Sequence, residues 1–256
     1  MPELPEVETV VRTVASRLTG RRLLEVRSFT RKPWARSLRK AAGQTIHGVR
    51  RYGKYILLDL DKGLLAIHLG MTGRLLASGV QGPYTRAALV LDRGTVWFED
   101  VRQFGSVRWI AREPEGLGPD ALEISAEEFV SRLGNCKSRL KALLLDQSFL
   151  RGIGNIYADE SLFRARLHPL AIAARLSERR ARKLHSAIVE VLSKAIAKGG
   201  SSVSDYVDAD GREGSFQFFH RVYQRTGEPC LMCGAPIRRI LVAQRSTHYC
   251  PRCQRI

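Results

Sequence analysis

The order of hydrophobic and polar residues changes twice along the chain. Residues 2–19 carry apolar side chains at helical spacing, with acidic residues in the opening turns and a glycine after the end, so they predict a helix. From about residue 23 to 110 the pattern becomes short apolar runs separated by glycines, which predicts strands joined by turns. Helical spacing then returns at residues 125–133, 139–146, 156–163 and 177–198.

These patterns predict an α+β fold with two main domains. The leading helix and the strand-rich region form an antiparallel sandwich or barrel over residues 1–115. Residues 113–120 have the proline and glycine composition of a linker. A helical domain follows at residues 121–222, and residues 223–256 form a separate C-terminal module. Within the helical domain, the polar, glycine-rich stretch 199–214 predicts a mobile loop.

The charge of the chain narrows the class of partner. The 256 residues include 42 Lys and Arg against 25 Asp and Glu, a formal net charge of +17. This excess favours a polyanionic partner, either nucleic acid or a membrane surface. The longest apolar runs, such as residues 64–69, are far shorter than the roughly 20 residues of a membrane-spanning helix, which excludes a spanning protein. The acidic opening lacks the features of a secretory signal, which predicts a cytoplasmic protein.

Cysteines crowd near the C-terminus. Two C-x2-C pairs are separated by sixteen residues, and they contain Cys230, Cys233, Cys250 and Cys253. Each pair can direct two thiolates at one point, so the spacing predicts one structural zinc ion held by four sulfurs. Two disulfides would suit a secreted protein, but the sequence shows no secretory signal. A region this short cannot bury a core of its own, so we expect the metal to supply most of its folding free energy. Its arginines favour contact with nucleic acid, and a protein-docking zinc ribbon is the alternative.

Three glycine-containing segments are candidates for binding a phosphate or a base. Residues 151–155 join two helical segments, and their two glycines would let backbone amides approach a phosphate, with Asn155 adding a side-chain amide. Met71 lies on a glycine-flanked turn, and Arg102 and Phe104 lie on a segment that leaves a strand. The ordinary alternatives are a helix-to-helix turn, a methionine in the core and a plain surface turn.

The N-terminus offers an unusual nucleophile. Removal of a methionine that precedes a small residue would leave Pro2 with a free secondary amine. An α-amine has a pKa near 8 against about 10.4 for Lys, so more of its nucleophilic form is present at neutral pH. Attack of this amine on a sugar aldehyde carbon gives an iminium cation, and Glu3 could then act as acid or base. The alternative is that Pro2 is simply a helix-start proline.

Taken in order, these segments resemble one family. The opening Pro2-Glu3-Leu4-Pro5-Glu6-Val7-Glu8-Thr9 is similar to the signature of bacterial formamidopyrimidine-DNA glycosylases, which excise 8-oxoguanine and ring-opened purines. The similarity continues at Gly53-Lys54-Tyr55, His68-Leu69-Gly70-Met71, residues 102–105, Gly152-Ile153-Gly154-Asn155-Ile156-Tyr157-Ala158, and Gly227-Glu228-Pro229-Cys230. It therefore covers essentially the whole chain.

The resemblance implies a fold and a reaction. The fold is a two-layered β-sandwich carrying the first helix, followed by a helix-two-turn-helix domain around Asn155 and a C-terminal zinc finger. The activity is that of a bifunctional glycosylase and abasic-site lyase acting on damaged double-stranded DNA by base excision and β,δ-elimination. Pro2 is implied as the nucleophile that forms a Schiff base at the sugar C1′, and Glu3 as the acid/base. Lys54 is implied in β-elimination, and Arg245 in phosphate binding and δ-elimination.

The resemblance also implies how DNA is held. The lesion must leave the base stack, and Met71, Arg102 and Phe104 would fill the space that it vacates. The stretch 199–214 would close over the flipped base. Further DNA contacts are implied at Tyr84, Gln103, Lys137, Lys141 and Asn155.

Three residues depart from the family pattern. Gln103 stands where a second Arg is usual, Tyr84 where many members have His, and Gln224 where Gly is common. These departures concern affinity and lesion preference more than the reaction. An endonuclease VIII-like enzyme for oxidised pyrimidines and a non-catalytic zinc-dependent DNA-binding protein are the alternatives. We expect a cytoplasmic monomer, associated with the nucleoid when bound to DNA, without a small-molecule cofactor.

Overall fold

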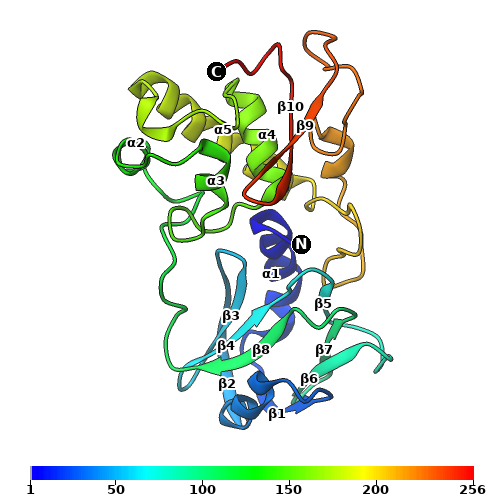
Figure 1. Cartoon of the computed structure of the whole chain (residues 1–256). Coiled ribbons are helices and arrows are strands. Elements are labelled where there is room, and N and C mark those ends of the chain that lie inside the picture. The colour runs from blue at the N-terminus through cyan, green and yellow to red at the C-terminus, as the bar shows by residue number, and fades with distance from the viewer. Residues whose placement is uncertain (1) are drawn as a thin grey trace. The chain divides into compact units, whose positions relative to one another are not determined.

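The computed structural model describes residues 2–256 and consists of two compact units (Figure 1). The N-terminal unit contains the residues up to Glu115 together with Ile196–Gln217, and the C-terminal unit contains Gly116–Ala195 and Phe218–Ile256. The α+β fold is confirmed, whereas the domain boundaries drawn from the sequence stay predictions. Across residues 2–256, none of the helices combines the length and hydrophobicity that a bilayer crossing needs.

Helix α1 (Leu4–Leu18) forms where the helical spacing predicts it. Glu3 is its N-cap residue, and the Glu6 carboxylate accepts a hydrogen bond of 2.8 Å from the Glu3 backbone N–H. A proline in the first turn fits because the first N–H groups of a helix have no partner within it. The buried stripe of the helix consists of Leu4, Val7, Val10, Val11, Val14 and Leu18.

The remainder of the N-terminal unit is an antiparallel sandwich. Its strands are β1 (Arg22–Ser28), β2 (Gln44–Tyr52), β3 (Tyr55–Leu60), β4 (Leu64–His68), β5 (Gly73–Leu76), β6 (Thr85–Leu91), β7 (Thr95–Asp100) and β8 (Ser106–Ile110), with the 3-10 helix η1 (Pro33–Ala41) before β2. The hydrogen-bonded order is β5-β7-β6-β1-β2-β3-β4-β8. β1 and β2 pair only at Arg22–Thr45 and Leu23–Gln44, so the sheet folds there into two layers (Figure 1). The sandwich prediction is confirmed, and the barrel alternative is wrong because β5 and β8 remain as edges.

The stretch 199–214 is better anchored than its composition predicts. It contains no helix or strand, but Tyr206 and Ala209 belong to the core of the N-terminal unit. The Tyr206 hydroxyl donates to the Glu6 backbone carbonyl at 3.3 Å, and the Ser201 N–H donates to the Glu6 carboxylate at 2.7 Å. The many polar residues around these few anchors account for the prediction of a mobile loop.

The C-terminal unit is built from helices and one hairpin. Its elements are α2 (Ala126–Gly134), α3 (Leu140–Leu145), α4 (Asn155–Ala165), η2 (Ala173–Arg175), α5 (Glu178–Ala197), η3 (Phe216–Phe219), β9 (Arg238–Val242) and β10 (Arg245–Tyr249). The last two residues of α5 and the first two of η3 are assigned to the N-terminal unit. The four α-helices match the predicted segments within two residues at each end. Ser125 caps α2 by accepting a 3.1 Å hydrogen bond from the Glu128 N–H.

The hairpin β9–β10 is held against the start of α4. Val242 pairs with Arg245, so the hairpin turns through Ala243 and Gln244, whose φ angles are 48° and 59°. Positive φ at both central residues is the requirement of a type I′ turn, which is compatible with the twist of the strands. The Asn155 side-chain amide donates 2.9 Å to the Ser246 carbonyl. The first residue of α4 therefore holds β10 at the position next to Arg245.

Candidate active site and metal centre

Pro2 and Glu3 lie at the positive end of α1. Both residues are buried, and Glu3 is only 2% exposed. Backbone dipoles favour negative charge at this end of a helix, which suits a carboxylate at Glu3 and at Glu6. The expected removal of Met1 concerns a residue outside the described part of the chain. Glu6 links the Glu3 amide to Ser201, so this buried carboxylate fixes the backbone beside the candidate nucleophile.

Lys54 occupies a two-residue turn between β2 and β3. Tyr52 pairs with Tyr55, and Gly53 has the positive φ of 60° that such a turn needs. The Lys54 side chain is largely buried, with 8% exposure of the residue. Burial first, and then the positive charges of Lys54 and Arg108, lower the pKa of His68 to about 4. Lys54 thus places its charge close to the end of β4.

Hydrogen bonds join the two loops that carry predicted DNA contacts, one after β4 and the other after β7. The Asp100 carboxylate accepts hydrogen bonds from the Thr72 hydroxyl at 2.6 Å and from the Gly105 N–H at 2.7 Å. Thr72 in turn accepts one of 3.1 Å from the Arg102 N–H. A β-carbon added to Gly70 would lie 2.5 Å from the Gly105 nitrogen, so only glycine permits this approach. The sequence offered no signal for Thr72 or Asp100, because their pairing crosses 28 residues.

These loops present an apolar and cationic cluster to solvent. Met71 is 36% exposed and Phe104 58% exposed, so the alternative of a methionine in the core is wrong. The Arg102 guanidinium lies 4.7 Å from the centre of the Phe104 ring. Gln103 has a left-handed φ of 54°, and its side-chain oxygen accepts a 3.4 Å hydrogen bond from the Thr30 hydroxyl. Tyr84 is 48% exposed, and its backbone carbonyl accepts a hydrogen bond from the Asp100 N–H, just before Arg102 and Gln103.

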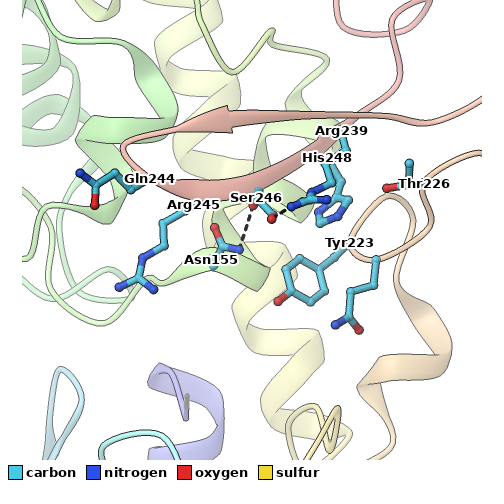
Figure 2. A pocket seen from close by; sticks show the side chains of 9 residues that line it. Asn155, Tyr223, Thr226, Arg239, Gln244, Arg245, Ser246 and His248 are labelled. Carbon is cyan, nitrogen blue, oxygen red and sulfur yellow. Dashed lines mark hydrogen bonds between the residues drawn. The ribbon is translucent and has the colours of Figure 1, made fainter.

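The C-terminal unit contains a polar pocket of about 730 Å³ (Figure 2). It is lined by Asn155, Tyr223, Gln224, Thr226, Arg239, Gln244, Arg245, Ser246 and His248. The Asn155 and Arg239 side chains both bond to Ser246, the latter at 3.0 Å to its hydroxyl. The buried side-chain oxygen of Asn155 has no hydrogen-bond partner among residues 2–256. No carboxylate is among the lining residues, so the pocket is suited to an anion.

Lys141 holds the backbone of Asn155, one of the residues that line this pocket. The side chain is fully buried, and its ammonium lies 2.7 Å from the Asp159 carboxylate and 2.8 Å from the Asn155 carbonyl. The same carboxylate accepts a 2.9 Å hydrogen bond from the His248 N–H and contacts the His248 ring at 3.1 Å. This geometry favours a positioning role for Lys141, rather than the direct phosphate contact expected from the sequence. Lys137 is exposed and is accessible to a ligand.

A second buried acid fixes the segment that enters the pocket. The Glu160 carboxylate accepts hydrogen bonds of 2.9–3.0 Å from the backbone N–H groups of Arg221, Val222 and Tyr223. Burial raises the pKa of Glu160, while these hydrogen bonds act in the opposite direction. Sequence reasoning missed Asp159, Glu160 and His248, because acids inside a helical pattern predict a solvated face rather than a buried clamp.

The four C-terminal cysteines meet at one point. The Cys230 and Cys253 sulfurs are 3.9 Å apart, those of Cys233 and Cys250 are 3.4 Å apart, and all four lie within 4.8 Å of one another. Tetrahedral Zn–S bonds of about 2.3 Å require sulfur separations of about 3.8 Å. The donor set therefore fits one structural zinc ion, whereas the sulfurs are too far apart for disulfides, which need about 2.0 Å.

Comparison with known proteins agrees with this architecture. Residues 1–107 match the N-terminal domain profile of formamidopyrimidine-DNA glycosylase, residues 116–207 its H2TH domain, and residues 227–256 the zinc finger found in FPG and IleRS. The formamidopyrimidine-DNA glycosylase of Solibacter usitatus is 55% identical over the full length of both chains. That of Geobacillus kaustophilus is 42% identical, again over the full length of both.

Solved structures give the same result. The MutM (Fpg) protein of Thermus thermophilus superposes with a TM-score of 0.91 at 44% identity, over 99% of this chain and 98% of that chain. A Lactococcus lactis FPG variant in complex with Fapy-dG DNA superposes with a TM-score of 0.89 at 33% identity, over the full length of both chains. The chain therefore belongs to the formamidopyrimidine-DNA glycosylase family.

Proposed function

We propose that this protein is a base-excision-repair DNA glycosylase and abasic-site lyase that removes oxidised purines from duplex DNA. Its full-length relatives are named for formamidopyrimidine excision, and a solved relative holds Fapy-dG DNA. The observation that carries the proposal is the Pro2-Glu3 opening, buried at the start of α1 and fixed by Glu6. This arrangement places an α-amine and a carboxylate side by side on a rigid element.

The Pro2 amine is the proposed nucleophile. Its nitrogen forms a bond to the sugar C1′, and the bond from C1′ to the damaged base breaks as the base leaves with a proton. The Glu3 carboxylate takes up the Pro2 N–H proton and passes it to the ring oxygen as the sugar ring opens, which leaves an iminium cation at C1′. Because the proline nitrogen carries no second hydrogen, this cation cannot become a neutral imine and remains an electron sink.

Strand cleavage follows from the same cation. Loss of a proton from C2′ expels the 3′ phosphate, and a second elimination expels the 5′ phosphate. Lys54 is the proposed participant in the first elimination, and Arg245 binds phosphate during the second. Lys54 lies in the tight turn between β2 and β3, and Arg245 is the first residue of β10, directly after the hairpin turn.

The remaining DNA contacts follow the same proposal. Met71, Arg102 and Phe104 occupy the space left by the extruded base, since an apolar insert and a charged donor offset the cost of unstacking. Tyr84 and Gln103 contact DNA near this cluster, and Lys137 and Asn155 contact phosphates. Lys141 acts through Asn155, whose carbonyl it holds.

The organisation of the protein completes the proposal. The proposed functional domains span residues 1–115, 121–222 and 223–256. The matched family ranges 1–107, 116–207 and 227–256 begin near these boundaries, and Ile196–Gln217 belong structurally to the N-terminal unit. The protein works as a cytoplasmic monomer, is associated with the nucleoid when bound to DNA, and uses zinc but no small-molecule cofactor.

Borohydride trapping tests the reaction. After intact-mass analysis establishes a free Pro2, the protein is incubated with a duplex containing one 8-oxoguanine opposite cytosine, and borohydride reduces any iminium to a stable adduct. We expect a covalent adduct with the parent protein and at least a tenfold loss with Pro2→Gly, which should still bind the duplex.

The matched control is Pro5→Gly, which changes a proline in the first turn of the same helix without touching the amine. This variant should be trapped like the parent. Equal trapping of Pro2→Gly would refute the requirement for a secondary amine at this position. Trapping on oxidised pyrimidines alone would favour an endonuclease VIII-like enzyme, and no trapping on either lesion would favour a non-catalytic DNA-binding protein.

A further inference from the structure

Gln224 adopts a backbone conformation that L-residues other than Asn and Asp rarely accept. Its φ is 59°, in the left-handed region. The Arg225 N–H donates 3.1 Å to the Val222 carbonyl, so Gln224 is the third residue of a tight turn. Positive φ at this position normally selects glycine, which has no β-carbon to clash with the backbone.

The surrounding structure holds Gln224 in this conformation. Glu160 binds the backbone N–H groups of the three preceding residues, and Arg225 donates hydrogen bonds to the carbonyls of Arg221 and Pro229. Backbone strain that is maintained by the surrounding structure clusters at functional sites.

Gln224 lines the pocket of the C-terminal unit together with Asn155 and Arg245. Within the described chain, the Gln224 amide and the Arg245 guanidinium have no intramolecular hydrogen-bond or ion-pair partner. Asn155 keeps an unpaired side-chain oxygen, and its amide is used by Ser246. The pocket thus contains free donors and positive charge but no carboxylate among its lining residues. The ligand that matches this set is a phosphodiester of the DNA backbone.

We infer that Gln224 is a DNA-binding residue, and that its side-chain amide donates a hydrogen bond to the DNA backbone in this pocket. The inference rests on the proposed DNA-repair function. A neutral amide displaces no counterion, so its contribution differs from that of Arg245: it strengthens binding without steepening the dependence on salt. In this left-handed turn Gln224 lines the pocket, and a glycine at the same position would bring no side-chain donor to it.

Two Gln224 variants and one control variant together separate the effect of the side-chain amide from the effect of the backbone strain. Gln224→Gly removes both, so the melting temperature should stay level or rise by about 1–3 °C. At the same time, the dissociation constant for a duplex with a tetrahydrofuran residue opposite cytosine should increase three- to tenfold. The slope of log affinity against log salt should be unchanged. Gln224→Glu keeps the shape of the side chain but brings a carboxylate to the phosphate, and it should weaken binding more than tenfold.

Ala243→Gly is the matched control. Ala243 also has a left-handed φ, of 48°, but does not line the pocket, so this variant relieves comparable strain and should bind DNA like the parent. Unchanged affinity in Gln224→Gly and Gln224→Glu, with a parent that is trapped on the 8-oxoguanine duplex, overturns the inference alone. A loss of affinity that appears only with a lower melting temperature, or equally in Ala243→Gly, also overturns it. A parent that neither binds nor is trapped overturns the proposed function, and the inference with it.

Discussion

His68 shows how the sandwich places a titratable side chain beside a fixed charge. It ends β4 opposite Tyr55, whose ring centre is 4.8 Å from that of His68. Its Nδ1 accepts a 3.1 Å hydrogen bond from the Gly70 N–H, which begins the turn carrying Met71. Burial, together with the charges of Lys54 and Arg108, keeps the ring neutral by lowering its pKa to about 4.

This lowered pKa makes stability depend on pH. In the unfolded chain, the His68 ring takes up a proton as the pH falls through about 6.5, whereas in the folded protein it does so only near pH 4. The stabilisation is therefore complete above pH 6.5 and is lost as the pH falls from 6.5 to 4, by about 3 kcal/mol. His68→Asn keeps an acceptor for Gly70, and we expect it to flatten the decline of melting temperature over this range. The remaining slope has the same sign, because burial also lowers the pKa of His220 to about 4.

A slope that is identical in parent and variant would contradict the assignment to His68. Phe is not a suitable replacement, because it would leave the Gly70 N–H without its acceptor.

Single residues also mark the limit of sequence reasoning. The family resemblance implied a DNA contact for Lys141, but the side chain is fully buried against Asp159. The sequence separation of the pair is 18 residues, and no local pattern indicates which Lys and which Asp will meet. Pro2, Glu3 and the four cysteines could be singled out because their chemistry is contained in a short stretch or a fixed spacing.

At the scale of elements, α4 organises the C-terminal unit. Its first residue bonds to β10, Asp159 holds His248 on the same strand, and Glu160 holds the turn before the zinc-binding segment. The metal site has only a small core around it, in which Phe163, Val222 and Ile237 surround the buried cysteines. The hairpin therefore depends on the metal on one side and on α4 on the other.

Removal of zinc tests this dependence. We expect a chelator strong enough to empty the four-cysteine site to weaken binding of a damaged duplex by at least tenfold, because the hairpin that carries Arg245 loses most of its folding free energy. The N-terminal sandwich should keep its structure, and its β-sheet circular dichroism signal should therefore be unchanged. Metal content, measured in the same sample, establishes that the ion is gone.

Cysteine variants provide the control. Cys250→Ser should lose zinc and DNA affinity together, whereas Cys136→Ser, at a cysteine outside the cluster, should keep both. Full affinity after verified loss of the metal would show that the hairpin stands without it.

Helices were easier to predict than the long connection. The four α-helices of the C-terminal unit have apolar positions at regular spacing, which local sequence reveals. The stretch 199–214 has no such spacing, and its anchors Tyr206 and Ala209 are buried only by residues far away in the sequence. Its attachment to the N-terminal unit could therefore be seen only in three dimensions.

At the scale of the whole molecule, the net charge of +17 favours binding to DNA, and the number of phosphate contacts determines how that binding responds to salt. About half a dozen phosphate contacts give a slope near −5 in a plot of log affinity against log salt. We expect the affinity for a damaged duplex to fall about a thousandfold between 50 and 200 mM salt. Lys137→Gln and Arg245→Gln should each reduce the slope by about 0.9.

Arg36→Gln is the control for this experiment, because Arg36 is an exposed arginine to which no DNA contact is assigned. It should leave the slope as it is. If all three variants change the slope equally, general charge rather than particular contacts governs binding.

The division of the chain has a consequence for the order in which the protein is made. The ribosome releases the N-terminus first, and domains generally fold as they emerge. Here the sandwich core also contains Tyr206 and Ala209, which are translated after the helical stretch Gly116–Ala195. The half of the protein that is synthesised first is thus completed only after most of the second half has left the ribosome, and until then Glu6 lacks the Ser201 amide that it binds in the finished molecule.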